Sequence, residues 1–134
     1  VDTEYGLIVP NIKSIDSNTI SNIDIEVKDL EDSAKKRRLK NETLQGASFT
    51  VSSLSGVGGK FFTPIINPPE VGILGLSRTF DSLRLDKLKL ETVKMLPVSL
   101  SYDHRVINGV YAIQFINHLS EVLNDIKFLE DSFK

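Results

Sequence analysis

The sequence has no cysteine, no long apolar run and no excess of charge of one sign. The absence of cysteine excludes disulfides, thiolate metal sites and a cysteine nucleophile, and it is typical of a reducing compartment. The longest apolar stretches, such as residues 71–76, are far shorter than the roughly 20 residues that cross a bilayer, and no charged-then-apolar leader precedes them. The formal net charge of -2 gives no overall field that attracts nucleic acid or an anionic membrane. These features predict a soluble protein without nucleic-acid or membrane partners.

The length and the first residues bear on domain organisation. With 134 residues, of which 40% are hydrophobic, the chain suffices for one hydrophobic core and is short for two domains. The first residue is Val1 rather than methionine, and residues 1–10 have an apolar pattern typical of ordered structure. We therefore expect residues 1–134 to be the C-terminal part of a single domain that is incomplete at its N-terminus.

Strand and helix patterns interleave along the chain. Residues 1–9 predict a short strand pair or a bent strand, and residues 20–34 have the three- and four-residue spacing of an amphipathic helix. Residues 109–126 predict one further helix, whose apolar stripe is expected to face the core. Residues 81–89 have the composition of a hairpin loop. The remaining predicted strands are residues 47–54, 61–66, 71–76 and 93–102. This order favours an α/β fold, a two-layer sandwich of a mixed sheet and covering helices.

Two segments have features of binding sites but simpler explanations. The basic run at residues 35–38 closes the first helix, where cations oppose the negative end of the helix dipole, and no aromatic residues interleave with it to stack on bases. The Ser-Gly-Val-Gly-Gly segment at residues 55–59 lacks the lysine-serine ending of a P-loop and the glycine spacing of a dinucleotide site. A helix end and a tight, close-packed turn are therefore favoured over nucleic-acid and nucleotide binding.

The densest group of reactive side chains follows the last predicted strand. Asp103, His104, Arg105 and Asn108 lie between that strand and Gly109, which begins a helix. An imidazole with an unperturbed pKa of about 6.5 is available as a proton acceptor near neutral pH. From the composition of this loop alone, a catalytic histidine is favoured only slightly over an ordinary hydrogen-bonded one.

Several motifs in order carry a resemblance to a known family. Asp103-His104-Arg105, with Gly109 five residues after the histidine, is preceded by Met-Leu-Pro-Val-Ser-Leu-Ser-Tyr at 95–102. Upstream are Gln-Gly-Ala-Ser-Phe-Thr-Val-Ser-Ser-Leu at 45–54, Phe-Thr-Pro-Ile-Ile-Asn-Pro-Pro-Glu-Val-Gly-Ile-Leu-Gly at 62–75, and short matches within residues 1–10. Together they resemble the signature of the dihydrolipoamide acyltransferase components of 2-oxo acid dehydrogenase complexes. The likeness spans almost the whole chain, and residues 67–77 favour the acetyl-transferring pyruvate branch over branched-chain or succinyl transfer, which both remain open.

The resemblance implies a fold similar to chloramphenicol acetyltransferase, with homotrimers that assemble into hollow cores and active sites in a channel between subunits. It implies transfer of an acyl group from dihydrolipoamide to coenzyme A, with the lipoyl group carried on another domain, no metal, and other subunits of the complex as partners. It implies a cytoplasmic location in a bacterium or a mitochondrial-matrix location. By the same likeness His104 matches the catalytic histidine, and Ser52 matches the serine that stabilises the tetrahedral oxyanion.

The proposed chemistry gives reasons for both residues. An alkyl thiol with a pKa near 8.5 is mostly protonated at neutral pH, so a base must remove its proton, and the gap of roughly two pKa units to an imidazole amounts to about 2.7 kcal/mol. A tetrahedral oxyanion needs a hydrogen-bond donor where the charge develops. Without the family match, Ser52 is better explained as a surface hydroxyl on a strand. Asn108 occupies a position where many relatives have aspartate; we assign it to holding the loop, without proton transfer.

The remaining polar residues favour structural roles. On an extended backbone Asp103 and Arg105 point away from His104, and we expect both to pair with other charged groups. His118 is expected to be a solvated side chain on the last helix. A zinc site using both histidines lacks the usual short spacing and a third ligand.

Two alternatives to the acyltransferase remain. One is a non-catalytic structural core or assembly module with the same fold, which is compatible with a truncated chain. The other is a free acetyltransferase that acts on a small hydroxylated substrate.

Overall fold

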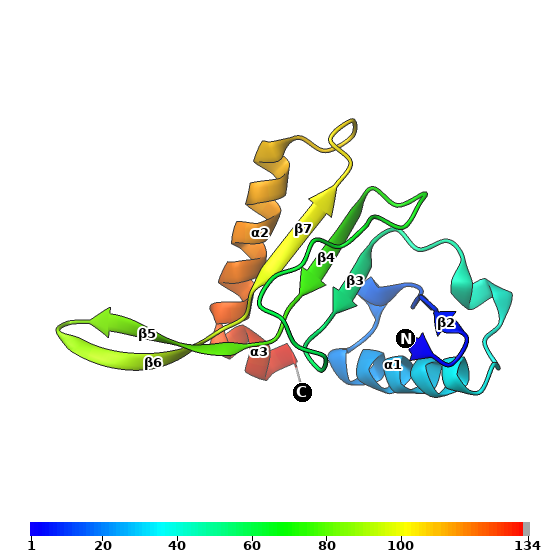
Figure 1. Cartoon of the computed structure of the whole chain (residues 1–134), viewed down its shortest axis with the longest axis horizontal. Helices are drawn as coiled ribbons and strands as arrows, with labels where there is room; N and C mark the ends of the chain where they lie inside the picture. The colour runs from blue at the N-terminus through cyan, green and yellow to red at the C-terminus, as the bar shows by residue number, and fades with distance from the viewer. Residues whose placement is uncertain (133–134) are drawn as a thin grey trace. The chain divides into compact units, whose positions relative to one another are not determined.

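A computed structural model describes residues 1–132 of the chain (Figure 1). The chain forms two compact units, and the division falls within one helix. One unit comprises Val1–Ala47 together with the residues from Asn117 onward, and the other comprises Ser48–Ile116. Each unit is therefore described by itself, and the assignment of residues 1–134 to one domain stays a prediction.

The first unit contains the predicted strand pair and first helix, which are confirmed. Strands β1 (Asp2–Thr3) and β2 (Gly6–Leu7) pair antiparallel. After the 3-10 turn η1 (Ile15–Ser17), helix α1 (Ile20–Lys35) begins behind Thr19, whose side-chain oxygen accepts a hydrogen bond from the backbone N–H of Asn22. A second 3-10 turn, η2 (Asn41–Leu44), follows.

The basic run at the end of α1 has local partners. Lys35 pairs with Glu31 and Lys36 with Asp32, each one helical turn away. The guanidinium carbon of Arg37 lies 3.0 Å from the centroid of the Tyr5 ring. Three of the four cations therefore have intramolecular partners.

The last helical segment differs from the prediction, because it is two helices rather than one. Helix α2 (Gly109–Asn124) ends before Asp125, and helix α3 (Ile126–Ser132) follows. The Asp125 carboxylate accepts a hydrogen bond from the backbone N–H of Phe128, as an N-cap does, and so begins the new helix. The expectation that the apolar stripe is buried was also wrong: Ile113 and Ile126 are exposed, and Ala112 is the buried residue of α2.

The second unit is built on a three-stranded mixed sheet in the order β3-β4-β7, with β3 at Thr50–Ser53, β4 at Gly72–Leu76 and β7 at Val98–Tyr102. Strand β3 runs parallel to β4, and β7 runs antiparallel to it. The central strand β4 is buried at four successive residues, which is typical of a strand covered on both faces. The first turns of α2 cover one face, where the rings of Phe49 and Phe115 lie 5.8 Å apart. The α/β class is confirmed.

The opposite face of β4 is covered by a segment that was wrongly predicted to be a strand. Residues 61–66 are extended but belong to no sheet. Phe62 and Pro64 point inward, and a Cβ atom added to Gly75 would lie 2.8 Å from the Phe62 ring and 3.2 Å from Pro64. Pro64 has no N–H to donate to a ladder, so this segment packs through side chains only.

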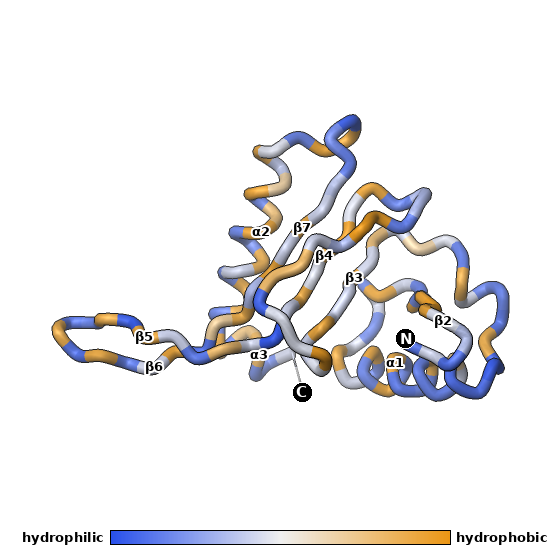
Figure 2. Tube along the Cα trace, viewed as in Figure 1, coloured by the Kyte–Doolittle hydropathy of each residue, from blue (hydrophilic) through white to orange (hydrophobic). Residues whose placement is uncertain are grey.

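The segment predicted as a loop at residues 81–89 is part of a long hairpin, which we call the β5–β6 arm (residues 80–95). Strands β5 (Phe80–Asp86) and β6 (Lys89–Met95) pair antiparallel along their whole length. Lys87 and Leu88 form the turn with φ values of 43° and 68°. Both central residues have positive φ, as in a type I′ turn, but neither is the asparagine or glycine that usually signals it. Apolar and polar residues both occur along the arm (Figure 2).

Two further expectations change in this unit. The strand predicted at residues 93–102 is interrupted by Leu96 and Pro97, so it is divided between β6 and β7. The glycine segment at residues 55–59 forms a turn but is not close-packed, because Cβ atoms added at Gly56, Gly58 and Gly59 meet nothing within 4 Å. Gly58 and Gly59 have φ values of 120° and 88°, so the backbone conformation is what requires glycine there. No helix within residues 1–132 is long and apolar enough to span a membrane.

The close approach at Gly75 generates a stability prediction. Gly75→Ala should lower the free energy of unfolding by about 1–3 kcal/mol, because the added methyl group overlaps the Phe62 ring inside a packed strand. Gly56→Ala is the matched control, since its methyl group enters open space and its cost should stay within about 0.5 kcal/mol. Urea unfolding midpoints measure both. Equal midpoints for the two variants would show that residues 61–66 do not pack on β4.

Candidate active site

His104 lies in a short loop between β7 and α2. The backbone N–H of Asp103 donates to the Val71 carbonyl, which extends the β4–β7 pairing, and the Asp103 carbonyl accepts from the N–H groups of Val106 and Ile107. These bonds form a tight turn with His104 at its start. The His104 side chain is exposed, and its ring lies 5.7 Å from the Tyr102 ring, centroid to centroid. The imidazole nitrogens make no hydrogen bond to any described residue. The ring is therefore accessible to a substrate.

The two charged neighbours of His104 bind each other, so the expectation that they pair with other charged groups was wrong. Arg105 Nε donates to Asp103 Oδ1 at 2.9 Å, and Nη2 donates to Oδ2 at 2.6 Å. The backbone N–H of Arg105 also donates to Oδ1 at 3.0 Å. The side-chain hydrogen bonds from Arg105 lower the pKa of Asp103 from 3.8 to about 2. The two residues of this bidentate ion pair are thus the immediate sequence neighbours of His104.

Asn108 caps the helix that follows the loop. Its side-chain oxygen Oδ1 accepts a hydrogen bond from the backbone N–H of Tyr111 at 3.0 Å, and its carbonyl accepts from the N–H of Ala112. Asn108 thus fixes the point at which the loop becomes helix, four residues after His104. An amide at this position supplies hydrogen bonds and no charge.

Ser52 lies on β3, away from the His104 loop. In the sheet register Ser52 is opposite Gly75, and Gly75 is opposite Ser99, whereas Tyr102 is opposite Gly72. Ser52 and the end of β7 are thus two strands and three residues apart, which is on the order of 14 Å between Cα atoms. Since Ser99 and Tyr102 point to opposite faces, Ser52 also lies on the other face from Tyr102. The Ser52 hydroxyl is half-buried and makes no hydrogen bond to a described residue.

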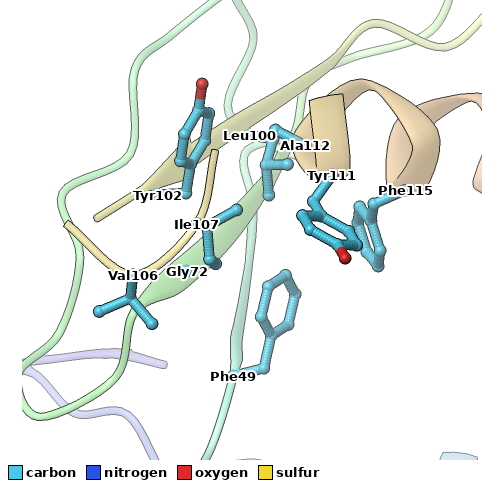
Figure 3. A pocket seen from close by; sticks show the side chains of 9 residues that line it. All are labelled: Phe49, Gly72, Leu100, Tyr102, Val106, Ile107, Tyr111, Ala112 and Phe115. Carbon is cyan, nitrogen blue, oxygen red and sulfur yellow. The ribbon is translucent and has the colours of Figure 1, made fainter. Parts of the chain in front are cut away.

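An apolar pocket of about 400 Å³ lies between the sheet and α2, next to the His104 loop (Figure 3). The sticks in Figure 3 show the rings of Phe49, which directly precedes β3, of Tyr102 at the end of β7, and of Tyr111 and Phe115 on α2 gathered around it. Its lining residues are Phe49, Gly72, Leu100, Tyr102, Val106, Ile107, Tyr111, Ala112 and Phe115. A Cβ atom at Gly72 would lie 3.0 Å from the Phe49 ring, so glycine makes the space that this ring occupies.

Sequence reasoning missed this pocket. Phe49 and Tyr102 were assigned to strand patterns, and Tyr111 and Phe115 lie outside the apolar stripe that was singled out. The available signal was the aromatic spacing of four residues at Tyr111 and Phe115, which places both rings on one helix face.

The described residues 1–132 bring no group of three or more His, Asp or Glu side chains together that could hold a metal ion. His118 belongs to the other compact unit. Its side chain is 78% exposed and lies 4.0 Å from Glu121. His118 is therefore solvated, as predicted.

Residues 1–130 match the protein family described as 2-oxoacid dehydrogenases acyltransferase (catalytic domain). The chain belongs to this family. It is 46% identical over 129 residues to the dihydrolipoyllysine-residue acetyltransferase component of the pyruvate dehydrogenase complex of Pseudomonas aeruginosa, and the match covers 96% of the chain and 24% of that protein. The corresponding component from Azotobacter vinelandii is 44% identical, with 95% of the chain and 20% of that protein covered. The chain thus spans about a quarter or less of these curated relatives.

Solved structures of the family have the same fold. The dihydrolipoamide acetyltransferase of Azotobacter vinelandii, studied for the role of one serine, one histidine and one asparagine in its catalytic mechanism, matches with a TM-score of 0.90 at 43% identity. That match covers 95% of this chain and 52% of that chain. A truncated catalytic core of the 2-oxoacid dehydrogenase multienzyme complex of Thermoplasma acidophilum matches with a TM-score of 0.82 at 37% identity, covering 93% of this chain and 55% of that chain. The expected chloramphenicol-acetyltransferase-like fold is confirmed.

The ion pair beside His104 generates a pH prediction. Arg105→Gln should raise the pKa of Asp103 from about 2 towards 3.8, because the charged donor that stabilises the carboxylate is lost. In the unsubstituted protein, the contribution of this ion pair to the free energy of unfolding is fully present at a pH above the pKa that Asp103 has in the unfolded chain. This contribution is lost as the pH falls through the pKa of about 2 that Asp103 has in the folded protein. NMR titration of the Asp103 carboxyl carbon measures the shift. Arg84→Gln, on β5, is the control and should leave this titration unchanged; a pKa still near 2 in Arg105→Gln contradicts the assignment.

Proposed function

We propose that this chain supplies half of a catalytic site that transfers an acetyl group from the sulfur of dihydrolipoamide to the sulfur of coenzyme A. The observation that carries the proposal is the trio Ser52, His104 and Asn108. The serine, histidine and asparagine studied in the Azotobacter vinelandii acetyltransferase occur in the same order and, in that enzyme's own numbering, at the same separations along the chain. The names of the curated relatives support acetyl transfer within a pyruvate dehydrogenase complex.

His104 acts as the general base. Its exposed imidazole takes the proton from the coenzyme A thiol, and the thiolate formed attacks the carbonyl carbon of the acetyl thioester. The tetrahedral intermediate then collapses, the bond from carbon to the dihydrolipoamide sulfur breaks, and the imidazolium returns its proton to that sulfur. The thiol pKa exceeds that of an imidazole by roughly two units, about 2.7 kcal/mol, a deficit that close positioning of the reactants offsets.

The loop around His104 supports this role by its rigidity. The Asp103–Arg105 pair and the three hydrogen bonds through the Asp103 backbone fix the turn, while Asn108 fixes the helix that follows. A base that is held in one place loses less freedom on reaching the transition state. Asn108 holds the loop and moves no proton.

Ser52 donates a hydrogen bond to the oxyanion of the tetrahedral intermediate. Within one chain it lies too far from the His104 loop for both to touch one thioester, by the sheet register described above. The donor and the base must therefore come from different copies of the chain. This supports a homotrimer whose sites lie between subunits and which assembles into a larger core. A relative that is 44% identical in sequence forms the cubic core of a pyruvate dehydrogenase complex.

The remaining partners follow from the reaction. The dihydrolipoyl group reaches the site on another domain, coenzyme A is a substrate, and other subunits of the complex supply the acetyl group. The proposed location is the bacterial cytoplasm or the mitochondrial matrix. No metal takes part in the proposed steps.

Acetyl transfer from acetyl-dihydrolipoamide to coenzyme A tests the roles of both residues in the full-length protein. His104→Ala should lower kcat by roughly 10²–10⁴-fold, because the proposed base that takes the thiol proton is lost. Ser52→Ala should lower kcat by roughly 10²–10³-fold, the usual effect of losing one oxyanion donor. His118→Ala is the matched control and should keep full activity. Unchanged turnover in His104→Ala would contradict the enzyme assignment. Oligomers of unsubstituted protein that assemble but transfer no acetyl group would favour the non-catalytic structural module.

A mixing experiment tests whether each site draws on two copies. His104→Ala and Ser52→Ala chains are co-expressed and assembled together, so that random pairing restores an intact serine and an intact histidine in about a quarter of the sites of a cyclic assembly. We expect about a quarter of the unsubstituted rate. If both groups came from one chain, no site would be intact and the mixture would stay as inactive as its components.

A further inference from the structure

Glu70 is a buried acidic residue to which the proposed mechanism assigns no role. Glu70 and Thr50 are both 8% exposed. The Thr50 hydroxyl donates a hydrogen bond to Glu70 Oε2 at 2.6 Å, which is short for a bond between two oxygens, and the Asn67 amide donates to Oε1 at 3.4 Å. A buried carboxyl group is costly unless such hydrogen bonds replace those to water. The two donors are therefore held to one carboxyl group inside the fold.

The turn before β4 depends on this side chain because two of its residues cannot donate backbone hydrogen bonds. Pro68 and Pro69 have no N–H. The backbone N–H of Glu70 donates to the Asn67 carbonyl at 3.0 Å, which closes the turn. The Glu70 carboxyl group then joins the turn to Thr50, the first residue of β3. We call the side-chain contacts of Glu70 with Thr50 and Asn67 the Glu70 clamp.

The Glu70 clamp lies at the end of the sheet that carries the His104 loop. Gly72, two residues after Glu70, is opposite Tyr102 in the register. The residue between them, Val71, has the carbonyl that accepts the 2.9 Å hydrogen bond from the Asp103 N–H. Asp103 immediately precedes His104. One peptide bond, one hydrogen bond and one further peptide bond thus connect Glu70 to His104.

The other end of the clamp is connected to the pocket beside His104. Phe49 directly precedes Thr50, and its ring lines the apolar pocket together with Val106 and Ile107 (Figure 3). The N–H groups of Val106 and Ile107 donate to the Asp103 carbonyl and so form the turn that carries His104. The clamp therefore holds two structures on which this turn rests, the Val71 carbonyl and the strand that carries the Phe49 ring.

We propose that Glu70 is a positioning residue for His104, because its clamp fixes the Val71 carbonyl to which the His104 turn is bonded. Glu70 is buried and acts only through the base. Displacing a catalytic group by about 1 Å costs on the order of 10²-fold in rate. A displaced base weakens the transition state and leaves substrate binding largely intact, so kcat falls and KM does not. The inference rests on the proposed function for the role of His104.

Acetyl transfer by the full-length protein tests the Glu70 clamp from both ends. Glu70→Ala should lower kcat by about tenfold and leave KM for both substrates within about twofold, because only the base is displaced. Glu70→Gln should recover most of this loss. The Thr50 hydroxyl can accept as well as donate, and the Asn67 amide can turn its oxygen towards the new amide, so both contacts persist. Thr50→Val removes the same hydrogen bond from its other end and should also lower kcat, which covers the case in which Glu70→Ala does not fold.

Thr19→Val is the matched control. It also removes a hydrogen bond of a threonine side-chain oxygen, but in the other compact unit, at the start of α1. Thr19→Val should lower the urea midpoint and leave kcat unchanged. Hydrogen exchange read by mass spectrometry gives an independent signature. Peptides from residues 98–107 should exchange faster in Glu70→Ala, because the Asp103 N–H loses its fixed acceptor, whereas peptides from residues 20–35 should exchange as before.

A double substitution separates positioning from a general loss of folded protein. If Glu70 acts through His104, then Glu70→Ala has nothing left to displace once the base is removed. The double variant of His104→Ala and Glu70→Ala should therefore keep the kcat of His104→Ala within about twofold. A merely structural role for Glu70 predicts a further loss of about tenfold, because independent effects multiply.

The outcomes separate this inference from the proposed function. Normal kcat in both Glu70→Ala and Thr50→Val, or multiplied losses in the double variant, overturns the role of Glu70 and leaves His104 as the proposed base. A Glu70→Gln variant as impaired as Glu70→Ala also overturns it, because the two contacts would then be insufficient. Unchanged turnover in His104→Ala contradicts the proposed function itself, and the role of Glu70 with it.

Discussion

The hydrogen-bonded register of β3, β4 and β7 determines where the reactive groups of this chain lie. It places Ser52 opposite Gly75 at one end of the sheet and continues past Tyr102 to the His104 loop at the other. Backbone pairing of this kind cannot slip by one residue without turning every side chain to the opposite face. A buried central strand makes such a slip costly, because Ile73 and Leu74 are 5% and 6% exposed. The separation of the proposed base and the proposed oxyanion donor is therefore a fixed property of the fold, and the proposed site must draw on a second copy to bridge it.

The central strand β4 has a glycine on each of its two faces. Gly72 leaves room for the Phe49 ring on the side of the pocket, and Gly75 leaves room for the Phe62 ring on the other side. Side chains at either position would push these rings away from the sheet, moving the pocket wall on one face and the covering segment on the other. The glycines that allow rings to pack closely on β4 thus also shape the apolar pocket beside His104.

The sequence contained enough to locate the main elements and the candidate trio, but not the arm. Helix α1 was predictable from its three- and four-residue apolar spacing, and strand β4 from a short continuous apolar run. Ser52 was identified only through family resemblance, since an isolated strand serine has no chemical signature. The arm was missed because neither Lys87 nor Leu88 is a residue type that usually takes a positive φ, and because Leu83, Leu85 and Leu90 are exposed, so no alternation of buried and exposed residues marks its strands.

Solvent exclusion gives the proposed assembly a chemical purpose beyond bringing Ser52 and His104 together. In one copy the imidazole of His104 is open to water, and so is the apolar surface around it, including Val106 and Tyr111. Water there would solvate the thiolate and the oxyanion and would weaken the hydrogen bond on which Ser52 acts, whereas a dry site strengthens it.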